Sequence, residues 1–259
     1  MNNIRWHIGC SGFHYRDWKE VFYPLDIPQR KWFEYYSGRF DTLELNVTFY
    51  RFPQLKFLQN WYDNSPAHFS FAVKAPRLIT HYKQFNDCER LLNDFYTTTE
   101  QGLKDKLGAV LFQLSPKWHY TEERLDLVVS NMRKRFTNVV EFRHETWWNK
   151  KVYQRLKNEG IIFCGISHPT LPDEPIVTNK TAYYRFHGVP RLYHSAYNND
   201  MLKKIADALA ADKNIKNVFI YFNNTATIGA IENAIWLTEY VKKFEGRRLK
   251  TEGGLRSKV

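Results

Sequence analysis

Ionisable residues follow short apolar runs at several points in this sequence. In VVEFRHETWW, residues 139–148, two valines are followed by Glu141, Arg143 and His144, and then by two tryptophans. A carboxylate, a guanidinium and an imidazole in one place can exchange protons with a substrate and bind its anionic groups. Such groups act together only if the fold brings them to one site.

Polar residues end nearly every apolar run that we predict to be a strand. They are Cys10 and Ser11; Glu44, Asn46 and Thr48; Lys74 and Arg77; Gln113; Glu141, Arg143 and His144; Ser167 and His168; Arg185 and His187; and Asn223 and Asn224. One such residue is better explained as a structural ion pair. Six or more strands that supply polar groups to one rim exceed that need and indicate a site.

Cations outnumber carboxylates in this set, which favours a phosphate, sulfate or carboxylate ligand. We expect Lys74, Arg143 and Arg185 to bind the anionic group. The predicted ligand is therefore an anionic small molecule or an anionic polymer, a nucleic acid.

Acid–base chemistry at the same rim would fall to carboxylates and imidazoles. Glu44 or Glu141 would be the general base, and His187 or His144 would exchange protons near neutral pH. Amide side chains would orient the substrate through hydrogen bonds, and the candidates are Asn46, Gln113 and Asn223. We expect Ser11, His81, His144 and Asn224 to contact the substrate as well.

Aromatic residues also follow the strand ends, among them Tyr15, Trp18 and Trp147. They would either stack on a base or a sugar ring, or cover the apolar core. Both interpretations stay open, and the three are kept as candidate substrate contacts.

A divalent metal is only weakly indicated. His81, His187, Glu44 and Glu141 are suitable ligand types, but no HExxH spacing occurs and the neighbouring cations would oppose a metal ion. GCSGFH, residues 9–14, lacks the third glycine of a dinucleotide fingerprint and the Lys-Ser/Thr of a P-loop, so no nucleotide cofactor is indicated. The cofactor is thus left undetermined.

Eight short β-branched and aromatic runs must position these residues. They are 6–9, 42–47, 69–73, 109–114, 139–142, 161–166, 182–186 and 218–222, mostly separated by helical patterns. This number and rhythm predict a single α/β domain with a (β/α)8 TIM-barrel-like fold. An open doubly wound sheet is the alternative, because the alternation alone does not show closure.

The helical evidence is clearest in three segments. Thr121 is a predicted N-cap, followed by an apolar stripe of Leu125, Val128, Val129, Met132 and Phe136. The segment from Asn199 repeats the spacing with Leu202, Ile205, Ala206 and Leu209, and the segment from Ile228 repeats it with Ile231 and Ile235. The sixth βα unit contains three prolines and no helical period, so we expect an irregular crossover there.

Composition sets the class of protein. The 259 residues are 43% hydrophobic and carry a formal charge of +11, which suits either an anionic partner or a basic protein without a nucleic-acid role. We expect one barrel domain over residues 4–245 and a mobile basic tail over 246–259.

The cysteines and the apolar segments predict a location. Three widely spaced cysteines, no signal-peptide pattern and no apolar run of about 18 residues favour the cytoplasm and no membrane partner. The oligomeric state stays open.

Seven blocks in this order, from Ile8 to about Tyr240, closely resemble the YecE-like family, also called domain of unknown function 72. They are IGCSGFHYRDWKEVFYP, QRKWFEYYSGRFDTLELNVTFYRFP, FSFAVKAPRLITH, DKLGAVLFQLSP, VVEFRHETWW, AYYRFHG and VFIYFNNT. The resemblance implies a TIM-barrel-like fold in a bacterial cytoplasmic protein with no assigned activity. By fold similarity the family has been likened to metal-dependent barrels such as endonuclease IV and xylose isomerase.

The family's shared polar positions fall on Ser11, Gly12, Tyr15, Trp18, Glu44, Asn46, Thr48, Tyr50, Lys74, Pro76, Thr80, His81, Gln113, Glu141, Arg143, His144, Trp147, Arg185, His187, Gly188, Asn223 and Asn224. Cys10 departs from the family, which more often has Thr there. A thiol at the mouth would be a weaker hydrogen-bond donor than a hydroxyl.

Three hypotheses follow. The leading one is an enzyme that acts on a phosphate-containing or other anionic substrate at the C-terminal mouth of the barrel, as a hydrolase, lyase or isomerase. The second is a nucleic-acid-binding or nuclease-like barrel, and the third is a sugar or sugar-phosphate isomerase or lyase.

Overall fold

Eight strands form the centre of the molecule. The computed structural model describes residues 4–255, and their side chains as far as Lys243. The strands are β1 (Arg5–Cys10), β2 (Thr42–Leu45), β3 (Ser70–Lys74), β4 (Leu107–Gln113), β5 (Asn138–Glu141), β6 (Ile162–Ser167), β7 (Thr181–Phe186) and β8 (Asn217–Phe222). They are parallel and pair in the order β1-β8-β7-β6-β5-β4-β3-β2. The predicted (β/α)8 fold is therefore confirmed.

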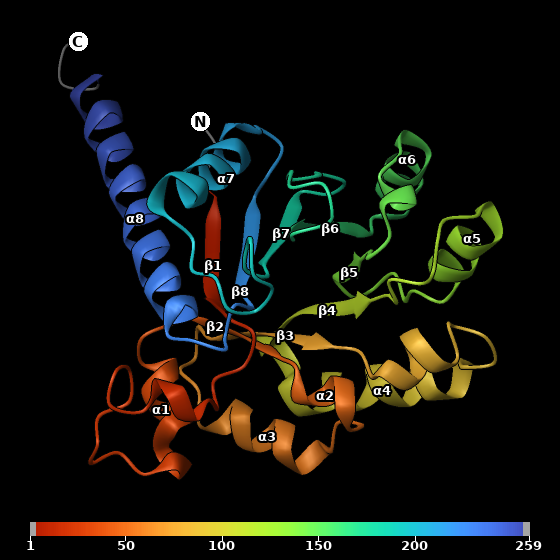
Figure 1. The fold of residues 1–259 in the computed structure, drawn as a ribbon, viewed down its shortest axis with the longest axis horizontal. Helices are drawn as coiled ribbons and strands as arrows, with labels where there is room; N and C mark the ends of the chain where they lie inside the picture. Colours follow the sequence, from red (N-terminus) through yellow and green to blue (C-terminus); the bar gives the residue numbers. More distant parts are fainter. Residues whose placement is uncertain (1–3, 256–259) are drawn as a thin grey trace.

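The sheet nearly closes on itself between β1 and β2 (Figure 1). A single bridge pairs Ser11 with Glu44. Elsewhere in the seam between β1 and β2, the Tyr36 hydroxyl accepts a hydrogen bond from the Cys10 N–H at 2.7 Å and donates one to the Thr42 carbonyl at 3.1 Å. A side chain thus replaces part of the backbone ladder in this seam, and it satisfies polar groups that would otherwise be buried unpaired.

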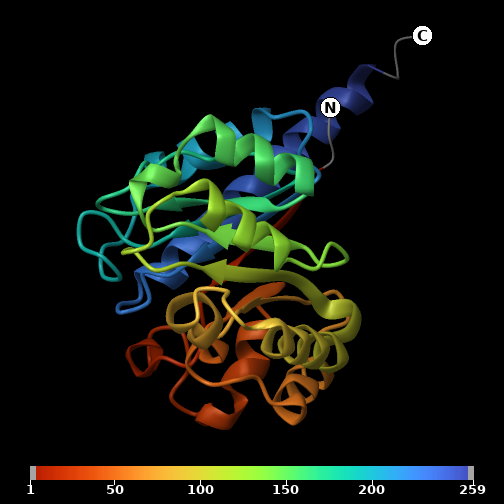
Figure 2. The same ribbon diagram turned by 90° about the vertical axis from the view of Figure 1, so that its right-hand side faces the viewer.

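Helices lie around the outer face of the sheet (Figure 2). They are α1 (Trp32–Ser37), α2 (Val47–Tyr50), α3 (Leu55–Asp63), α4 (Glu89–Leu103), α5 (Glu122–Ser130), α6 (Lys150–Glu159), α7 (Asn199–Ala211) and α8 (Gly229–Leu255). Short helical turns occur at η1 (Arg16–Trp18), η2 (Gln29–Lys31), η3 (Leu78–Tyr82), η4 (Lys104–Lys106) and η5 (Glu145–Trp147).

The predicted N-cap is confirmed, because the Thr121 hydroxyl accepts a hydrogen bond from the Arg124 N–H at 3.2 Å. The helix is shorter than predicted. It ends at Ser130, so Met132 and Phe136 pack from the turns that follow it.

Helices α7 and α8 begin where the sequence predicted. The four predicted apolar residues of α7 are buried. In α8, Ile231 is buried, whereas Ile235 is 41% exposed and its predicted place in the apolar stripe is wrong.

Strand β2 is also shorter than predicted. It ends at Leu45, and the chain turns directly into α2, where the Thr48 hydroxyl donates to the carbonyl oxygens of Leu45 and Lys74 at 2.9 and 2.6 Å. Asn46 and Thr48 therefore do not continue the strand face of Glu44, as the two-residue period suggested. Thr48 instead fixes the backbone at the end of β3.

The sixth unit is irregular, as predicted, with no helix between β6 and β7. The crossover is held to the barrel by Asp173, which accepts hydrogen bonds from the Ser167 hydroxyl at 2.8 Å and from the Tyr184 hydroxyl. Its prolines prevent a regular helix, and these side-chain bonds replace helix packing.

At the C-terminal end, α8 continues through Leu255, over most of the stretch that we predicted to be a basic tail. Residues 256–259 lie outside the described residues.

Within the described chain, we find no helix that is both long and apolar enough to cross a membrane.

Apolar side chains fill the interior of the barrel. They form a cluster separate from the one between sheet and helices, and it comprises Ala72, Ala109, Leu111, Val139, Ile162, Cys164, Ile166, Tyr183, Phe219 and Tyr221. This packed interior is the floor on which the polar residues of the strand ends lie.

Candidate active site

Strand alternation determines which side chains lie above this floor. Tyr183 belongs to the interior cluster, so Arg185, two positions later on β7, also faces inward. By the same rule Val139 precedes Glu141 on β5, and Ala72 precedes Lys74 on β3. Carboxylates and cations from different strands thus meet in one layer.

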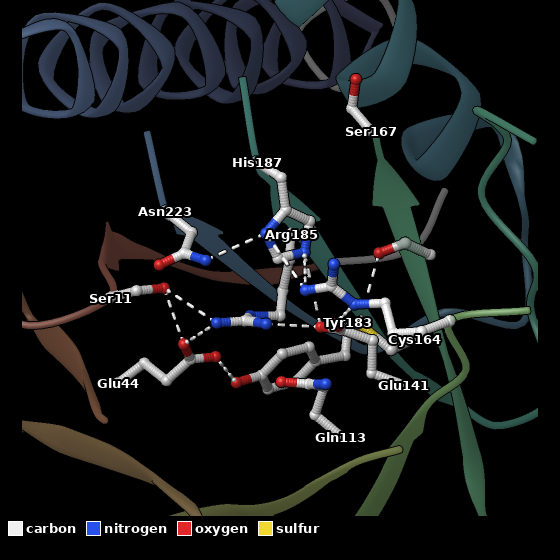
Figure 3. Close-up of polar contacts among 12 residues, drawn as sticks. Ser11, Glu44, Gln113, Glu141, Cys164, Ser167, Tyr183, Arg185, His187 and Asn223 are labelled. Atoms are coloured by element: carbon white, nitrogen blue, oxygen red, sulfur yellow. Dashed lines mark hydrogen bonds and ion pairs between the residues drawn. The ribbon is translucent and has the colours of Figure 1, made fainter. Parts of the chain in front are cut away.

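Arg185 joins the two carboxylates of this layer (Figure 3). Its Nη2 donates to Glu44 Oε1 at 2.6 Å, and its Nη1 donates to Glu141 Oε2 at 2.5 Å. All three side chains are fully buried. Burial of an ion pair is unfavourable unless the geometry is good and further hydrogen bonds complete it, and here Arg185 makes both contacts at short range.

Glu44 receives two more donors. The Ser11 hydroxyl donates to Oε1 at 2.6 Å, and the Tyr183 hydroxyl donates to Oε2 at 2.5 Å. With Arg185, both oxygens of this carboxylate are occupied. Glu44 is therefore a structural anion in this conformation, with no free oxygen directed to the mouth.

Glu141 is held ionised. Burial alone would raise its pKa, but the Arg143 and Arg185 guanidiniums beside it outweigh burial and hold the pKa well below its usual range. Arg143 Nε donates to Glu141 Oε1. A carboxylate with two guanidinium partners is a weak base, so Glu141 supports the cations more readily than it removes a proton.

His187 lies against Arg143. Arg143 Nη2 is 3.2 Å from His187 Nε2, and Asn223 Nδ2 is 2.9 Å from His187 Nδ1. Burial and the Arg143 charge hold the pKa of His187 well below its usual range. The ring is therefore neutral at physiological pH and cannot act as an imidazolium acid.

Lys74 differs from the other cations of the site. It is 8% exposed, and its amine lies 4.0 Å from the centre of the Phe49 ring. The amine makes no hydrogen bond or ion pair to any residue that the structure describes. Burial first, and then the Arg185 charge, lower the pKa of Lys74 to about 7.

His81 lies on the other side of Phe49. The two rings are 5.1 Å apart, His81 Nδ1 is 2.9 Å from the Thr80 hydroxyl, and Nε2 is 3.5 Å from the Gln113 amide. Burial and the Lys74 charge lower the pKa of His81 to about 4. The mouth therefore contains a second neutral imidazole.

Several predicted contact residues lie elsewhere. Trp18 and Trp147 are fully buried, and their indole N–H groups donate to the Thr227 and Trp118 carbonyls at 3.1 and 2.7 Å. Trp147 stacks on Phe142 at 4.2 Å, so it covers the core and does not face a ligand.

Three further predicted residues make local bonds. The Tyr15 hydroxyl donates to the Ser11 carbonyl at 2.6 Å, and His144 Nδ1 lies 2.9 Å from the Thr146 hydroxyl. Asn224 is buried against Asn233, its Nδ2 being 3.2 Å from that Oδ1.

Cys10 is also turned away from the mouth, because its Sγ faces the Ala230 carbonyl of α8 at 3.7 Å.

Sequence reasoning missed Tyr183 and Cys164. Tyr183 donates to Glu44, and Cys164 Sγ lies 3.9 Å from Glu141 Oε2. The signal for Tyr183 was present, because it precedes Arg185 by two positions on the same strand face.

An apolar groove of about 610 Å³ lies next to the charged layer. Gly12, Asn46 and Thr48 line it at the strand ends, and Phe57 and Trp61 of α3 line its far side. The buried Asn46 Oδ1 has no hydrogen-bond partner among the described residues. The groove can take an apolar group, and Asn46 Oδ1 can accept a hydrogen bond from an N–H or O–H group of the same ligand.

The donor sets of the described residues do not favour a metal. No group of three or more His, Cys, Asp or Glu side chains in this part of the chain is arranged to hold an ion. Glu44 and Glu141, the proposed ligands, face the Arg185 guanidinium instead.

Comparisons with known proteins agree with this fold. Residues 7–253 match the family described as protein of unknown function DUF72. The UPF0759 protein YunF of Bacillus subtilis (strain 168) is 26% identical over 271 residues, and the match covers 90% of this chain and 93% of that protein.

Solved structures of DUF72 family proteins are also similar. One from Thermotoga maritima has a TM-score of 0.83 and 26% identity, and covers 92% of this chain and 99% of its own. One from Enterococcus faecalis has a TM-score of 0.77, with 93% and 99% covered, and its 20% identity shows likeness of fold alone.

Proposed function

The chain belongs to the DUF72 family, and we propose that it is an enzyme that binds a phosphate- or carboxylate-bearing substrate at the C-terminal mouth of its barrel. The observation that carries the proposal is the Lys74 amine, which has no hydrogen-bond or ion-pair partner among the residues that the structure describes. The two buried carboxylates, Glu44 and Glu141, are matched by two guanidiniums, Arg185 and Arg143. Lys74 is the cation left over, and an anion from solution would complete the site.

The proposed roles of the two arginines, Arg185 and Arg143, differ from those that the sequence predicted. Arg185 is fully buried, and its two terminal nitrogens are paired with Glu44 and Glu141, so it positions the two carboxylates and does not reach a substrate. Its Nε has no hydrogen-bond partner among the described residues. Arg143 is 9% exposed, and its Nη1 has no hydrogen-bond partner among the described residues, so it is the guanidinium that faces the mouth. Arg143 and Lys74 would bind the anionic group together.

Catalysis is supported by the three perturbed groups that surround this place. Lys74, His81 and His187 all have pKa values below their ordinary range, mainly through burial. Such shifts cluster where proton transfer or nucleophilic attack is needed. Gln113 and Asn223 contact the two imidazoles and would orient them. A cytoplasmic location belongs to this proposal, supported by three unpaired, buried cysteines.

Sulfate binding tests the anion site. Isothermal titration at low ionic strength should detect one sulfate per chain, and Arg143→Gln should weaken it about tenfold, the effect of one charge-assisted hydrogen bond. Arg155→Gln is the matched control, because Arg155 pairs with Asp126 on the outer surface. Equal affinity of the parent and the Arg143→Gln variant would contradict the proposal.

A second candidate function is nucleic-acid binding, and one exposed cluster favours it. The Arg77 guanidinium lies 5.6 Å from the Tyr50 ring centre and 5.4 Å from that of Tyr82, and the tyrosines are 66% and 65% exposed. These rings can stack on bases beside the mouth. All eight tryptophans, by contrast, are buried or half-buried.

Single-stranded DNA binding tests this candidate. In fluorescence anisotropy at low salt, Tyr50→Ala combined with Tyr82→Ala should weaken binding of a short oligonucleotide at least about tenfold, because each stacked base contributes about 1–3 kcal/mol. Undetectable binding by the parent protein, or binding that the double variant leaves unchanged, would remove the candidate.

A further inference from the structure

We propose that Lys74 is a nucleophile that forms an imine with the carbonyl carbon of a small anionic aldehyde or ketone. This rests on the proposed anion site and deepens it by naming the chemical class of the substrate. In this complex the anionic group would lie at Arg143, and the carbonyl group would take the place beside the Lys74 amine, which a simple anion such as sulfate would share between Lys74 and Arg143.

The Lys74 backbone is held firmly while its amine is left free. Lys74 ends β3, and the Thr48 hydroxyl donates to its carbonyl oxygen at 2.6 Å. The amine itself lies over the Phe49 ring, 4.0 Å from its centre. A rigid backbone with an unoccupied amine at the C-terminal end of a barrel strand is the arrangement that a covalent catalyst needs.

Lys106 shows what a structural buried lysine looks like in the same protein. It is 7% exposed, close to the exposure of Lys74. Its amine donates to the Tyr62 carbonyl, the Ser65 carbonyl and the Ser65 hydroxyl at 2.6, 2.8 and 2.9 Å. All three of its protons are used, whereas those of Lys74 have no acceptor among the described residues.

The charges around Lys74 act on the pKa of its amine in opposite directions. Arg185 and Arg143 face it and oppose a third positive charge, while Glu141 and Glu44 favour one. His81 faces it as a neutral ring. With a pKa of about 7, roughly half of the Lys74 amines are neutral at neutral pH. Burial and neighbouring cations are the known means of activating a lysine for carbonyl chemistry.

The reaction balances without an oxidant or reductant. The neutral amine adds its lone pair to the carbonyl carbon, and a proton moves from nitrogen to oxygen to give a carbinolamine. The hydroxyl then leaves with a second proton as water, and a C=N bond forms. The imine can draw electrons from a neighbouring carbon, which suits lyase and isomerase reactions.

Reductive trapping tests the inference. The full-length protein is incubated at neutral pH with glyoxylate or glyceraldehyde 3-phosphate and sodium cyanoborohydride, and peptide mass mapping locates the reduced adduct. Lys74 should be labelled at least about tenfold faster than Lys106 or the exposed Lys117, because its neutral fraction is larger. Labelling no faster than that of Lys117 would overturn the inference.

Two variants separate nucleophilicity from charge. Lys74→Arg keeps a cation but should lose the adduct at position 74 while still binding sulfate. Arg143→Gln should slow labelling by glyoxylate more than labelling by the uncharged glycolaldehyde, because the loss of the guanidinium also makes the Lys74 amine easier to protonate. If the parent protein binds sulfate but Lys74 is not labelled preferentially, the imine is rejected and the anion site is retained. Equal labelling by charged and uncharged probes, unaffected by sulfate, would keep the nucleophile and reject the anion site.

Discussion

Replacing Arg185 by methionine is expected to lower the free energy of unfolding by about 3–5 kcal/mol at neutral pH. The change leaves Glu44 and Glu141 buried without the guanidinium that joins them. Glu141 keeps Arg143, but Glu44 keeps only the hydroxyls of Ser11 and Tyr183. Urea denaturation followed by tryptophan fluorescence measures the loss.

The loss of stability caused by Arg185→Met should depend on pH. In the parent protein the pKa of Glu141 is lower when folded than when unfolded, so its contribution to stability is present above the unfolded pKa and is lost as pH falls through the folded pKa. Without Arg185, burial favours the neutral form of a carboxyl group, so protonation at lower pH removes the cost of the uncompensated buried charge. The stability gap between parent and variant should therefore narrow as pH falls from 7 toward about 5. A gap that stays constant would contradict this account.

Glu44→Gln in the Arg185→Met background is the matched control. The amide keeps an oxygen that accepts from one of the Ser11 and Tyr183 hydroxyls, offers its NH2 group to the other hydroxyl oxygen, and carries no charge. It should recover part of the lost stability, because the penalty arises from an uncompensated charge and not from lost volume. A double variant less stable than Arg185→Met alone would show that the hydrogen bonds to Glu44 matter more than its charge.

Alternation along the strands made the barrel and the inward-facing residues predictable. Glu141 and Arg185 each follow a buried residue by two positions, so their face could be read from the two-residue period. The depth of these two side chains in the barrel could not be predicted in this way. How far a side chain lies below the rim depends on strand tilt and on the turn after each strand, which are set by the whole barrel. Arg185 was thus expected to bind substrate, but it is fully buried between Glu44 and Glu141.

The loops were the least predictable part of the site. Trp147 and Arg143 follow the same strand, but the η5 turn directs the indole into the core against Phe142. Asn46 and Thr48 leave the strand face because β2 ends after four residues. The spacing of apolar residues does not predict such turns.

Sulfate affinity should fall about tenfold or more as pH rises through about 7, because Lys74 loses its proton there. Anion binding favours the charged amine, so affinity is full below this pKa and is lost above it. Sulfate itself does not titrate in this range. Of the groups that face Lys74, Arg185 and Arg143 stay charged, Glu141 stays ionised, and His81, with a pKa of about 4, is already neutral.

Two substitutions at one position decide whether Lys74 is the titrating group. Lys74→Arg should bind sulfate tightly on both sides of neutrality, because a guanidinium does not lose its proton. Lys74→Met should bind weakly at every pH, since its side chain fills similar space without a charge. If Lys74→Met retains the parent's dependence on pH, another group controls the mouth. If the parent's affinity is flat while Lys74→Met is weak, the amine stays charged when buried, and it would be an anion ligand without the neutral form that carbonyl chemistry requires.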